Sequence, residues 1–233
     1  MLARLLQRLS RTSMHVRSCF RKQTLEQGRS ALHPHLAVVV LNGRMRLDGP
    51  TVNYSFGTLH RILAAALEKV DIGSRAPRSV LVLGLGAGSV VELLRRVHHA
   101  RAPIVGVEVD GEVLRLGREH FGLARWAGLE IVQADAQAFL AADARRFEFV
   151  LVDLFVDAVV PAPFRGRPFL QLLARRLAPG GLLLFNMIAD APGRRDEAAR
   201  LESELRGLFG SVEALPIHSN VVFAARDGLG GAV

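Results

Sequence analysis

The sequence has 233 residues, of which 50% are hydrophobic and 22% charged, so it fits a globular chain of one domain or slightly more. Its 22 glycines and 10 prolines are near average usage and exclude collagen-like and disordered chains, and its single cysteine, Cys19, excludes an internal disulfide and a thiolate metal cluster. The net charge is +8, and most of this excess comes from the residues before position 36, which include seven basic residues and one acid. Since the body is therefore nearly neutral, we expect no specific nucleic-acid partner.

The first 33 residues form a basic segment, for which we expect a flexible N-terminal arm. Leucines at positions 2, 5, 6 and 9 recur at helical spacing among arginines, which predicts a short amphipathic helix over the first eleven residues. A flexible tail, an organelle targeting segment and a segment that binds membrane surfaces or polyanions share this composition, and all three stay open. The arm lacks the apolar stretch of a secretory signal, and no apolar run is long enough to span a membrane. We expect a cytoplasmic protein, with organelle targeting as the alternative.

Residues 34–78 are expected to form a small N-terminal unit. The runs Leu36 to Leu41 and Arg44 to Leu47 are separated by Asn42-Gly43, which is a strong β-hairpin signal. Apolar residues then recur at helical spacing between positions 59 and 67. The pattern therefore predicts a hairpin and a helix that leads into the main domain.

From residue 79 to 233, short apolar segments alternate with amphipathic ones, as in a parallel sheet covered by helices. Strands are expected at 80–83, 104–109, 129–134, 147–152 and 182–187, and helices at 89–98, 112–121, 136–141, 168–177 and 194–208. The last two strands, 211–215 and 220–225, are only four residues apart, too close for a helical crossover, so they must pair antiparallel. This is the Rossmann-like α/β layout of the class I methyltransferase fold, a mostly parallel seven-stranded sheet that ends in an antiparallel hairpin.

A glycine-rich turn, Gly84-Leu85-Gly86-Ala87-Gly88, joins the first of these strands to a helix. Glycine tolerates a positive φ and allows a ligand to approach the backbone. Ser89 stands where a dinucleotide fingerprint has glycine or alanine, whereas Gly84-x-Gly86-x-Gly88 is the form that cradles the amino-acid part of S-adenosylmethionine. The pattern favours a cofactor loop, and a plain tight turn is the alternative.

Acidic residues follow the next two strands. Glu108 lies 20 residues beyond Gly88, with Val109 beside it, where an acid can accept both hydroxyls of a ribose. A solvated surface acid is the alternative for Glu108, and Asp110 is better explained as a helix cap. Asp135, followed by Ala136, can accept from the exocyclic amine of adenine, cap a helix, or do both.

The fourth strand ends in Asp153, at the centre of the carboxyl edge where open α/β sheets keep their chemistry. We therefore predict that Asp153 is catalytic. The alternative is a loop aspartate that accepts hydrogen bonds from nearby backbone N–H groups.

These motifs resemble the spermidine synthase-like family of polyamine aminopropyltransferases, which has the class I S-adenosylmethionine-dependent methyltransferase fold. The resemblance covers residues 36–225 and includes Leu47-Asp48-Gly49, Val80–Gly88, Val107-Glu108-Val109-Asp110, Asp135–Leu140, Phe147–Asp153 and Leu177-Ala178-Pro179-Gly180-Gly181. It implies a transferase of polyamine biosynthesis whose co-substrate is S-adenosylmethionine or its decarboxylated form, with no metal. It also implies that Glu108 holds the ribose, Asp135 the adenine, and that Asp153 takes a proton from the attacking amine. A homodimer is a further expectation.

The sequence departs from the family pattern at three places. Ala87 stands where the synthases have an acid that holds the aminopropyl nitrogen. Val156 stands where they have a second acid after the catalytic one, with Asp157 one position late. In the segment 51–57, Tyr54 is of a familiar type but not in matching register. A complete donor site and an altered polyamine site are therefore expected, with Tyr54 and Asp157 as candidate substrate contacts.

Three functions remain in competition. The first is aminopropyl transfer to a small-molecule amine, with Asp153 as general base. The second is methyl transfer to an unknown acceptor, which Ala87 favours because a neutral loop neither requires an aminopropyl amine nor repels the donor carboxylate. The third is a nucleoside-binding protein without catalysis, against which Glu108, Asp135 and Asp153 argue.

Overall fold

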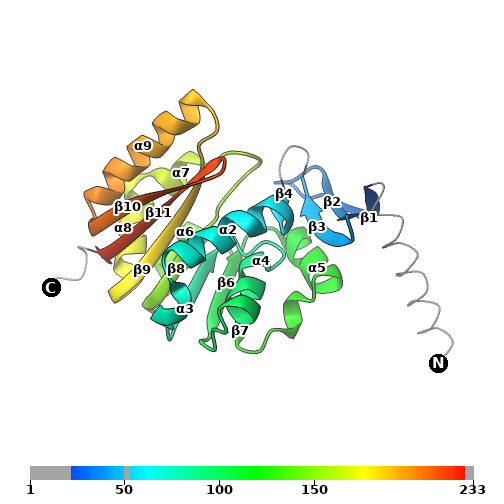
Figure 1. Cartoon of the computed structure of the whole chain (residues 1–233), viewed down its shortest axis with the longest axis horizontal. Coiled ribbons are helices and arrows are strands. Elements are labelled where there is room, and N and C mark those ends of the chain that lie inside the picture. The colour runs from blue at the N-terminus through cyan, green and yellow to red at the C-terminus, as the bar shows by residue number, and fades with distance from the viewer. Residues whose placement is uncertain (1–21, 50–52, 229–233) are drawn as a thin grey trace.

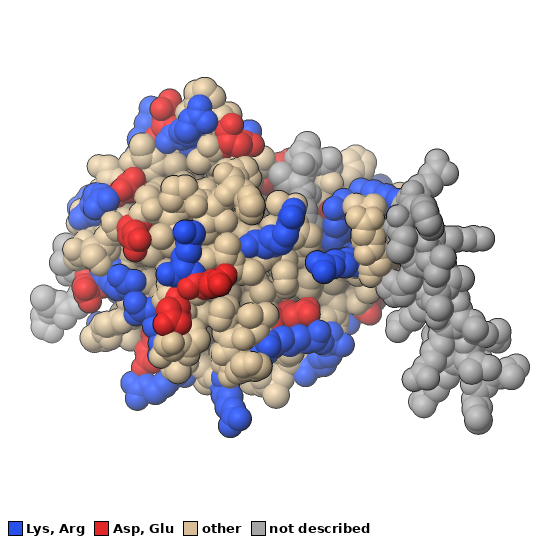
Figure 2. Space-filling view, in the orientation of Figure 1, with Lys and Arg blue, Asp and Glu red and all other residues tan. Residues whose placement is uncertain are grey.

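The computed structural model describes residues 22–49 and 53–228, and the helix predicted for the first eleven residues lies outside these ranges. The described residues form a four-stranded antiparallel sheet and a seven-stranded, mostly parallel sheet. Figure 1 shows the small sheet (blue) beside the end of the large sheet that is flanked by α2 and α5. On the face in Figure 2, acidic and basic side chains are interspersed. Among the described residues, no helix has the length and hydrophobicity that crossing a bilayer requires.

The small sheet has the strand order β1-β2-β3-β4, with β1 at Gln23–Gly28, β2 at Leu36–Leu41, β3 at Arg44–Asp48 and β4 at Asn53–Ser55. The predicted hairpin is confirmed, since β2 and β3 pair with Leu41 opposite Arg44. Asn42 and Gly43 have φ values of 51° and 71°, as the two central residues of a type I′ turn require. The turn matches the twist of the strands and so fixes their register.

The prediction of a flexible arm over residues 1–33 is wrong for residues 23–28, which form β1 and pair with β2. The strand escaped prediction because its sequence is polar and its stability comes from distant partners. Leu25 packs on the apolar cluster that includes Leu36 and Val38. The Glu26 carboxylate lies 2.5 Å from Nε2 of His120 and accepts from Arg115 at 2.6 Å.

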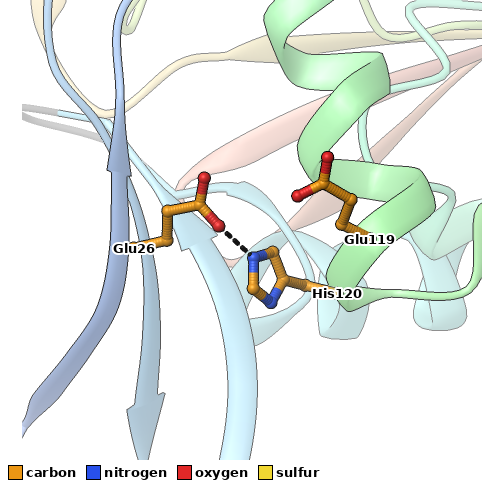
Figure 3. A group of neighbouring side chains, drawn as sticks. All are labelled: Glu26, Glu119 and His120. Carbon is orange, nitrogen blue, oxygen red and sulfur yellow. Dashed lines mark hydrogen bonds and ion pairs between the residues drawn. The ribbon is translucent and has the colours of Figure 1, made fainter.

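The Glu26 contacts join β1 to helix α5, Gly111–His120 (Figure 3). The carboxylate of Glu119 lies near the carboxylate of Glu26 and the imidazole of His120, and the three residues could offer ligand atoms within 4.8 Å of one another. Arg115, however, donates to both Glu26 and Glu119, so a guanidinium already balances these carboxylates. The cluster therefore connects strand β1 to helix α5 by ion pairs.

The large sheet has the strand order β10-β11-β9-β8-β5-β6-β7. Its parallel strands are β5 at Val80–Leu83, β6 at Ile104–Glu108, β7 at Leu129–Gln133, β8 at Phe147–Val152 and β9 at Leu177–Ile188. Strand β11, Asn220–Gly228, runs antiparallel between β9 and β10, Phe209–Ile217. The predicted Rossmann-like sheet with a terminal antiparallel hairpin is confirmed.

Two apolar layers cover the faces of this sheet, because alternate residues of each strand point to opposite sides. In β5, Leu81 and Leu83 join the layer of α6, α8 and α9, and Val80 and Val82 join that of α2 and α4. The helices are α2 Gly57–Lys69, α3 Ile72–Arg75, α4 Ser89–Glu92 continued by the π-helix Leu93–Val97, α6 Ala136–Ala142, α7 Ala162–Arg165, α8 Arg167–Arg176 and α9 Pro192–Arg206.

The small sheet packs on α5 through a third apolar cluster, in which Leu36, Val38 and Leu47 meet Val113 and Leu116. This contact places β4 and the residues before β2 over the carboxyl edge of the large sheet. The region between the two sheets is where the site lies.

Candidate active site

A cavity of about 660 Å³ lies at the carboxyl ends of the parallel strands, where open α/β sheets bind ligands. Its wall combines acids from several elements with apolar side chains. The acids among the described lining residues are Glu108, Asp135, Asp153, Asp157 and Asp190, and the apolar residues include Leu32, Leu59, Ile62, Phe155, Phe164 and Ile188. The fold thus brings together the three acids that the sequence singled out. An apolar wall with a few convergent polar groups is typical of a small-molecule site.

The glycine loop lies against the chain that follows β8. Gly84 has a φ of 86°, and a Cβ there would lie 2.2 Å from the carbonyl oxygen of Asp153. Gly84 and Gly86 line the cavity. Leu85, only 2% exposed, packs in the core, and Gly88 caps α4. Neither of these two residues is part of the cavity wall, so their contact with a cofactor stays a prediction. The close approach of Gly84 to Asp153 explains why a larger residue does not fit.

Glu108 is bound by the glycine loop. Its Oε2 accepts from the backbone N–H of Gly86 at 2.9 Å, and its Oε1 accepts from that of Asp110 at 3.1 Å. Burial raises the pKa of Glu108, while these backbone donors act in the opposite direction. Val109, which is 45% exposed, lines the cavity next to it. The loop and the acid therefore form one hydrogen-bonded unit, and the carboxylate has about four acceptor positions, more than its backbone donors occupy.

Two other acids have the capping roles that their sequence positions suggested. Asp110 begins α5, where its Oδ1 accepts from the N–H of Glu112 at 2.9 Å, and its Oδ2 accepts from the hydroxyl of Ser30. Asp135 begins α6 and accepts from the N–H of Ala138 at 2.9 Å. Asp135 also lines the cavity with Ala136. Since one N–H uses only one of the lone pairs of a carboxylate, capping leaves Asp135 able to accept from a ligand.

Asp153 is partly buried at the end of β8, and its backbone N–H bonds to the carbonyl of Leu83 at 2.8 Å. Its Oδ1 accepts from Nδ2 of Asn186 at 2.8 Å. Burial raises the pKa of Asp153 to about 6, opposed by the Asn186 hydrogen bond and assisted by the nearby charge of Glu108. A carboxyl group with a pKa in this range is suited to take a proton near neutral pH.

The sequence-based reasoning did not single out Asn186. It lies in β9 and has an exposed fraction of 0%. A polar amide inside the apolar run Leu182–Met187 is the signal that could have revealed it, because buried polar groups in sheets require partners.

Tyr54 and Asp157 form a hydrogen-bonded bridge in the wall of the cavity. The N–H of Asp157 donates to the Tyr54 hydroxyl at 2.9 Å, and this hydroxyl lies 3.2 Å from Oδ1 of Asp157. His33, 6% exposed, stacks on the Tyr54 ring with a centroid distance of 4.3 Å and also lines the cavity. Burial raises the pKa of Tyr54 to about 12, so the phenol remains protonated. His33 had no signal in the sequence, because only the tertiary fold brings it to Tyr54.

One departure from the synthase pattern, at Ala87, has a structural explanation. Ala87 is 1% exposed and packs in the cluster of Leu36 and Val38. The glycine loop therefore presents no acid to the cavity from this position. On the α9 side, Arg194 donates through Nε to Asp190 at 2.6 Å, and both residues line the cavity.

Comparisons with known proteins agree with this architecture. A family profile described as "Methyltransferase domain" matches residues 81–185. A probable polyamine aminopropyl transferase of Bifidobacterium longum (strain NCC 2705) is 30% identical over 139 residues, which are 59% of this chain and 30% of that protein. The match thus spans about a third of the length of that relative.

Two solved structures show the same fold. A probable spermidine synthase from Corynebacterium glutamicum ATCC 13032 superposes with a TM-score of 0.61 at 21% identity, over 86% of this chain and 76% of that one. Human methyltransferase-like protein 13, solved in complex with SAH, superposes with a TM-score of 0.60 at 21% identity, over 76% of this chain and 85% of that one. With its N-terminal antiparallel sheet and seven-stranded Rossmann-like sheet, the chain therefore has a spermidine synthase-like class I methyltransferase fold.

Proposed function

We propose that the chain is an alkyl transferase that uses a sulfonium donor of the S-adenosylmethionine type and transfers an aminopropyl group to an amine. The observation that carries this proposal is Asp153: a partly buried carboxylate with a pKa raised to about 6, beside the glycine loop at the carboxyl edge of the sheet. Aminopropyl transfer needs a base for the acceptor amine at this edge. The resemblance to named aminopropyl transferases supports the same interpretation.

The donor half of the cavity fits a nucleoside. Gly84 and Gly86 line it without side chains, which leaves space for the donor's tail next to the backbone. Glu108 would accept from the ribose hydroxyls, and Asp135 from the adenine amine, each through lone pairs not used by the backbone.

The charge of the cavity favours cations. Among the described lining residues there are five carboxylates but one guanidinium, Arg194, which is paired with Asp190. A sulfonium donor and an ammonium-bearing acceptor would both be attracted by this field. In the transfer step, the acceptor nitrogen attacks the methylene carbon next to sulfur, the C–S bond breaks with its electron pair going to sulfur, and the proton lost from nitrogen goes to Asp153.

The Asp153→Asn variant tests this role. It keeps the shape of the side chain but removes the base, so turnover with decarboxylated S-adenosylmethionine and a diamine should fall about 100-fold or more. The donor dissociation constant, measured by calorimetry, should stay within about threefold because the loop, Glu108 and Asp135 remain. Full activity would make Asp153 a structural residue. A collapse of donor binding in a folded variant would instead place Asp153 in the donor site.

Methyl transfer is the second candidate, and the burial of Ala87 favours it. The loop offers no carboxylate at the position where the synthases hold the aminopropyl nitrogen. Calorimetry with both donors separates the candidates, since a preference for decarboxylated S-adenosylmethionine supports aminopropyl transfer. A preference for intact S-adenosylmethionine supports methyl transfer.

A further inference from the structure

Two buried asparagines connect Asp153 to the last strand that enters the sheet. Asn186 in β9 donates through Nδ2 to Oδ1 of Asp153 at 2.8 Å. Its own Oδ1 accepts from Nδ2 of Asn220, at the start of β11, at 2.8 Å. Asn220 in turn accepts from the hydroxyl of Ser219 at 3.0 Å. Asn186 and Asn220 have exposed fractions of 0% and 5%, so water cannot replace these bonds freely.

The direction of this amide chain follows from the charge of Asp153. An ionised carboxylate only accepts hydrogen bonds, so Asn186 must present its NH₂ group to it. The carbonyl oxygen of Asn186 then faces Asn220, which must present its own NH₂ group. The oxygen of Asn220 is left to accept from Ser219. Reversing any one amide would place two donors or two acceptors opposite each other inside the sheet.

We propose that the Asn220–Asn186 amide chain is a positioning device that holds Asp153 ionised and commits one of its oxygens to the sheet, leaving the other for the proton of the acceptor. This inference rests on the proposed role of Asp153 as a base. Neither asparagine needs to touch the reacting atoms, since both act through Asp153.

The end of the amide chain that is farther from Asp153 also reaches the cavity, since Asn220 and Ser219 line it. The charged groups around Asp153 come from other elements. Glu108 at the end of β6 raises its pKa, and Asp135, Asp157 and the Asp190–Arg194 pair share the cavity wall. Burial and the charge of Glu108 favour the protonated form of Asp153. Asn186, in contrast, donates a hydrogen bond to Asp153 and favours the ionised form.

The experiment removes the donor without leaving an unpaired amide. In the double variant Asn186→Leu/Asn220→Leu, both side chains become apolar at a similar size, which is tolerated better than the removal of one partner. The acid limb of the kcat/KM profile should move to higher pH by about one unit, because loss of a donor to a charged group raises its pKa. Carbon-13 NMR of the Asp153 carboxyl group, recorded without substrates, should show the same shift.

Asn220→Asp gives a second test that changes only one terminal group. A carboxylate at 220 can only accept, so it would draw the NH₂ group of Asn186 away from Asp153 and turn the oxygen of Asn186 toward it. The NMR titration of Asp153 should then move upward at least as far as in the double variant. Val222→Ala is the control, since Val222 pairs with Asn186 across the strands but belongs to the apolar layer. It should lower thermal stability and leave both titrations in place.

The outcomes separate this inference from the proposed function. If the wild-type protein transfers nothing from either donor, the proposed function fails, while the NMR titration still tests the amide chain. If transfer occurs and depends on Asp153, but both asparagine variants fold and titrate as the wild type does, the positioning role is refuted.

Discussion

At the scale of the residue, Asp153 shows a conflict between stability and chemistry. Its carboxyl group lies where burial disfavours the charge that its proposed role requires, and its pKa rises from 3.8 to about 6. In the unfolded chain this group is ionised above about pH 4. Its contribution to stability is therefore fully present below that pH and is lost as the pH rises through about 6.

This conflict predicts that Asp153→Asn stabilises the protein near neutral pH. The neutral amide avoids the cost of an ionised buried group, which should raise the free energy of unfolding on the order of 2 kcal/mol above pH 7. At pH 4 the gain should vanish, because Asp153 is then protonated in the folded protein. Urea unfolding at both pH values measures the difference. An equal gain at both would mean that ionisation of Asp153 is not its source.

Burial raises the pKa of Glu108 as well, but backbone N–H groups donate to both oxygens of this carboxylate. Glu108→Ala should weaken methylthioadenosine binding by about 1.5–3 kcal/mol, the worth of hydrogen bonds to a charged acceptor. Calorimetry measures the affinity, and a thermal melt shows whether the loop still folds. An unchanged affinity in a folded variant would remove Glu108 from the donor site.

The sequence could predict these acids because each follows a buried strand at the same sheet edge. It could not predict His33, whose stacking on Tyr54 depends on the packing of the small sheet. It also singled out Leu85 as a ligand contact, but the loop turns this side chain against Gly106 in the core. Local spacing therefore locates backbone turns better than it locates the direction of a side chain.

At the scale of the element, predictability follows the source of stability. The central strands β5 and β8 are almost entirely apolar and buried, and their sequences alone indicate burial. Strand β1 is polar, has a register shift between Thr24 and Glu26, and is held by α5 from far along the chain. Strand β4 has three residues, too few for a periodic signal. The sequence of such a strand does not predict it, because its stability comes from residues that are distant in the chain.

The contacts between β1 and α5 predict different effects for Glu26 and Glu119, which both pair with Arg115. Glu26→Ala removes bonds from one element to another, whereas Glu119→Ala removes one ion pair within α5. We expect a lower urea midpoint for Glu26→Ala and a smaller or undetectable change for Glu119→Ala, since exposed pairs within a helix contribute little. Equal midpoints in both variants would show that β1 docks through its backbone pairing and Leu25 alone.

At the scale of the whole molecule, both sheets contribute to one cavity. Tyr54 comes from the small sheet, and Asp157 from the segment after β8 of the large sheet. The bridge joins the small sheet to the segment that follows Asp153, the proposed base for the acceptor. We therefore assign it to the acceptor half of the proposed site.

Tyr54→Phe keeps the ring that stacks on His33 and removes the hydroxyl that binds Asp157. The loss of about 1 kcal/mol of hydrogen bonding should raise the KM of the acceptor about fivefold. Steady-state kinetics with the amine varied measures this effect, and calorimetry should show an unchanged donor affinity. If donor affinity falls as much as the acceptor KM rises, the bridge supports the whole cavity and not its acceptor half.

The insertion of β11 between β9 and β10 has a consequence for biosynthesis. The glycine loop, Glu108 and Asp153 are translated long before Asn220, yet β9 has no partner on its outer side until residues 220–228 are available. A nascent chain that ends before this strand would carry the donor loop with the carbonyl of Asn186 unpaired. The site is thus completed late in synthesis, when the ribosome delivers the strand that closes the sheet.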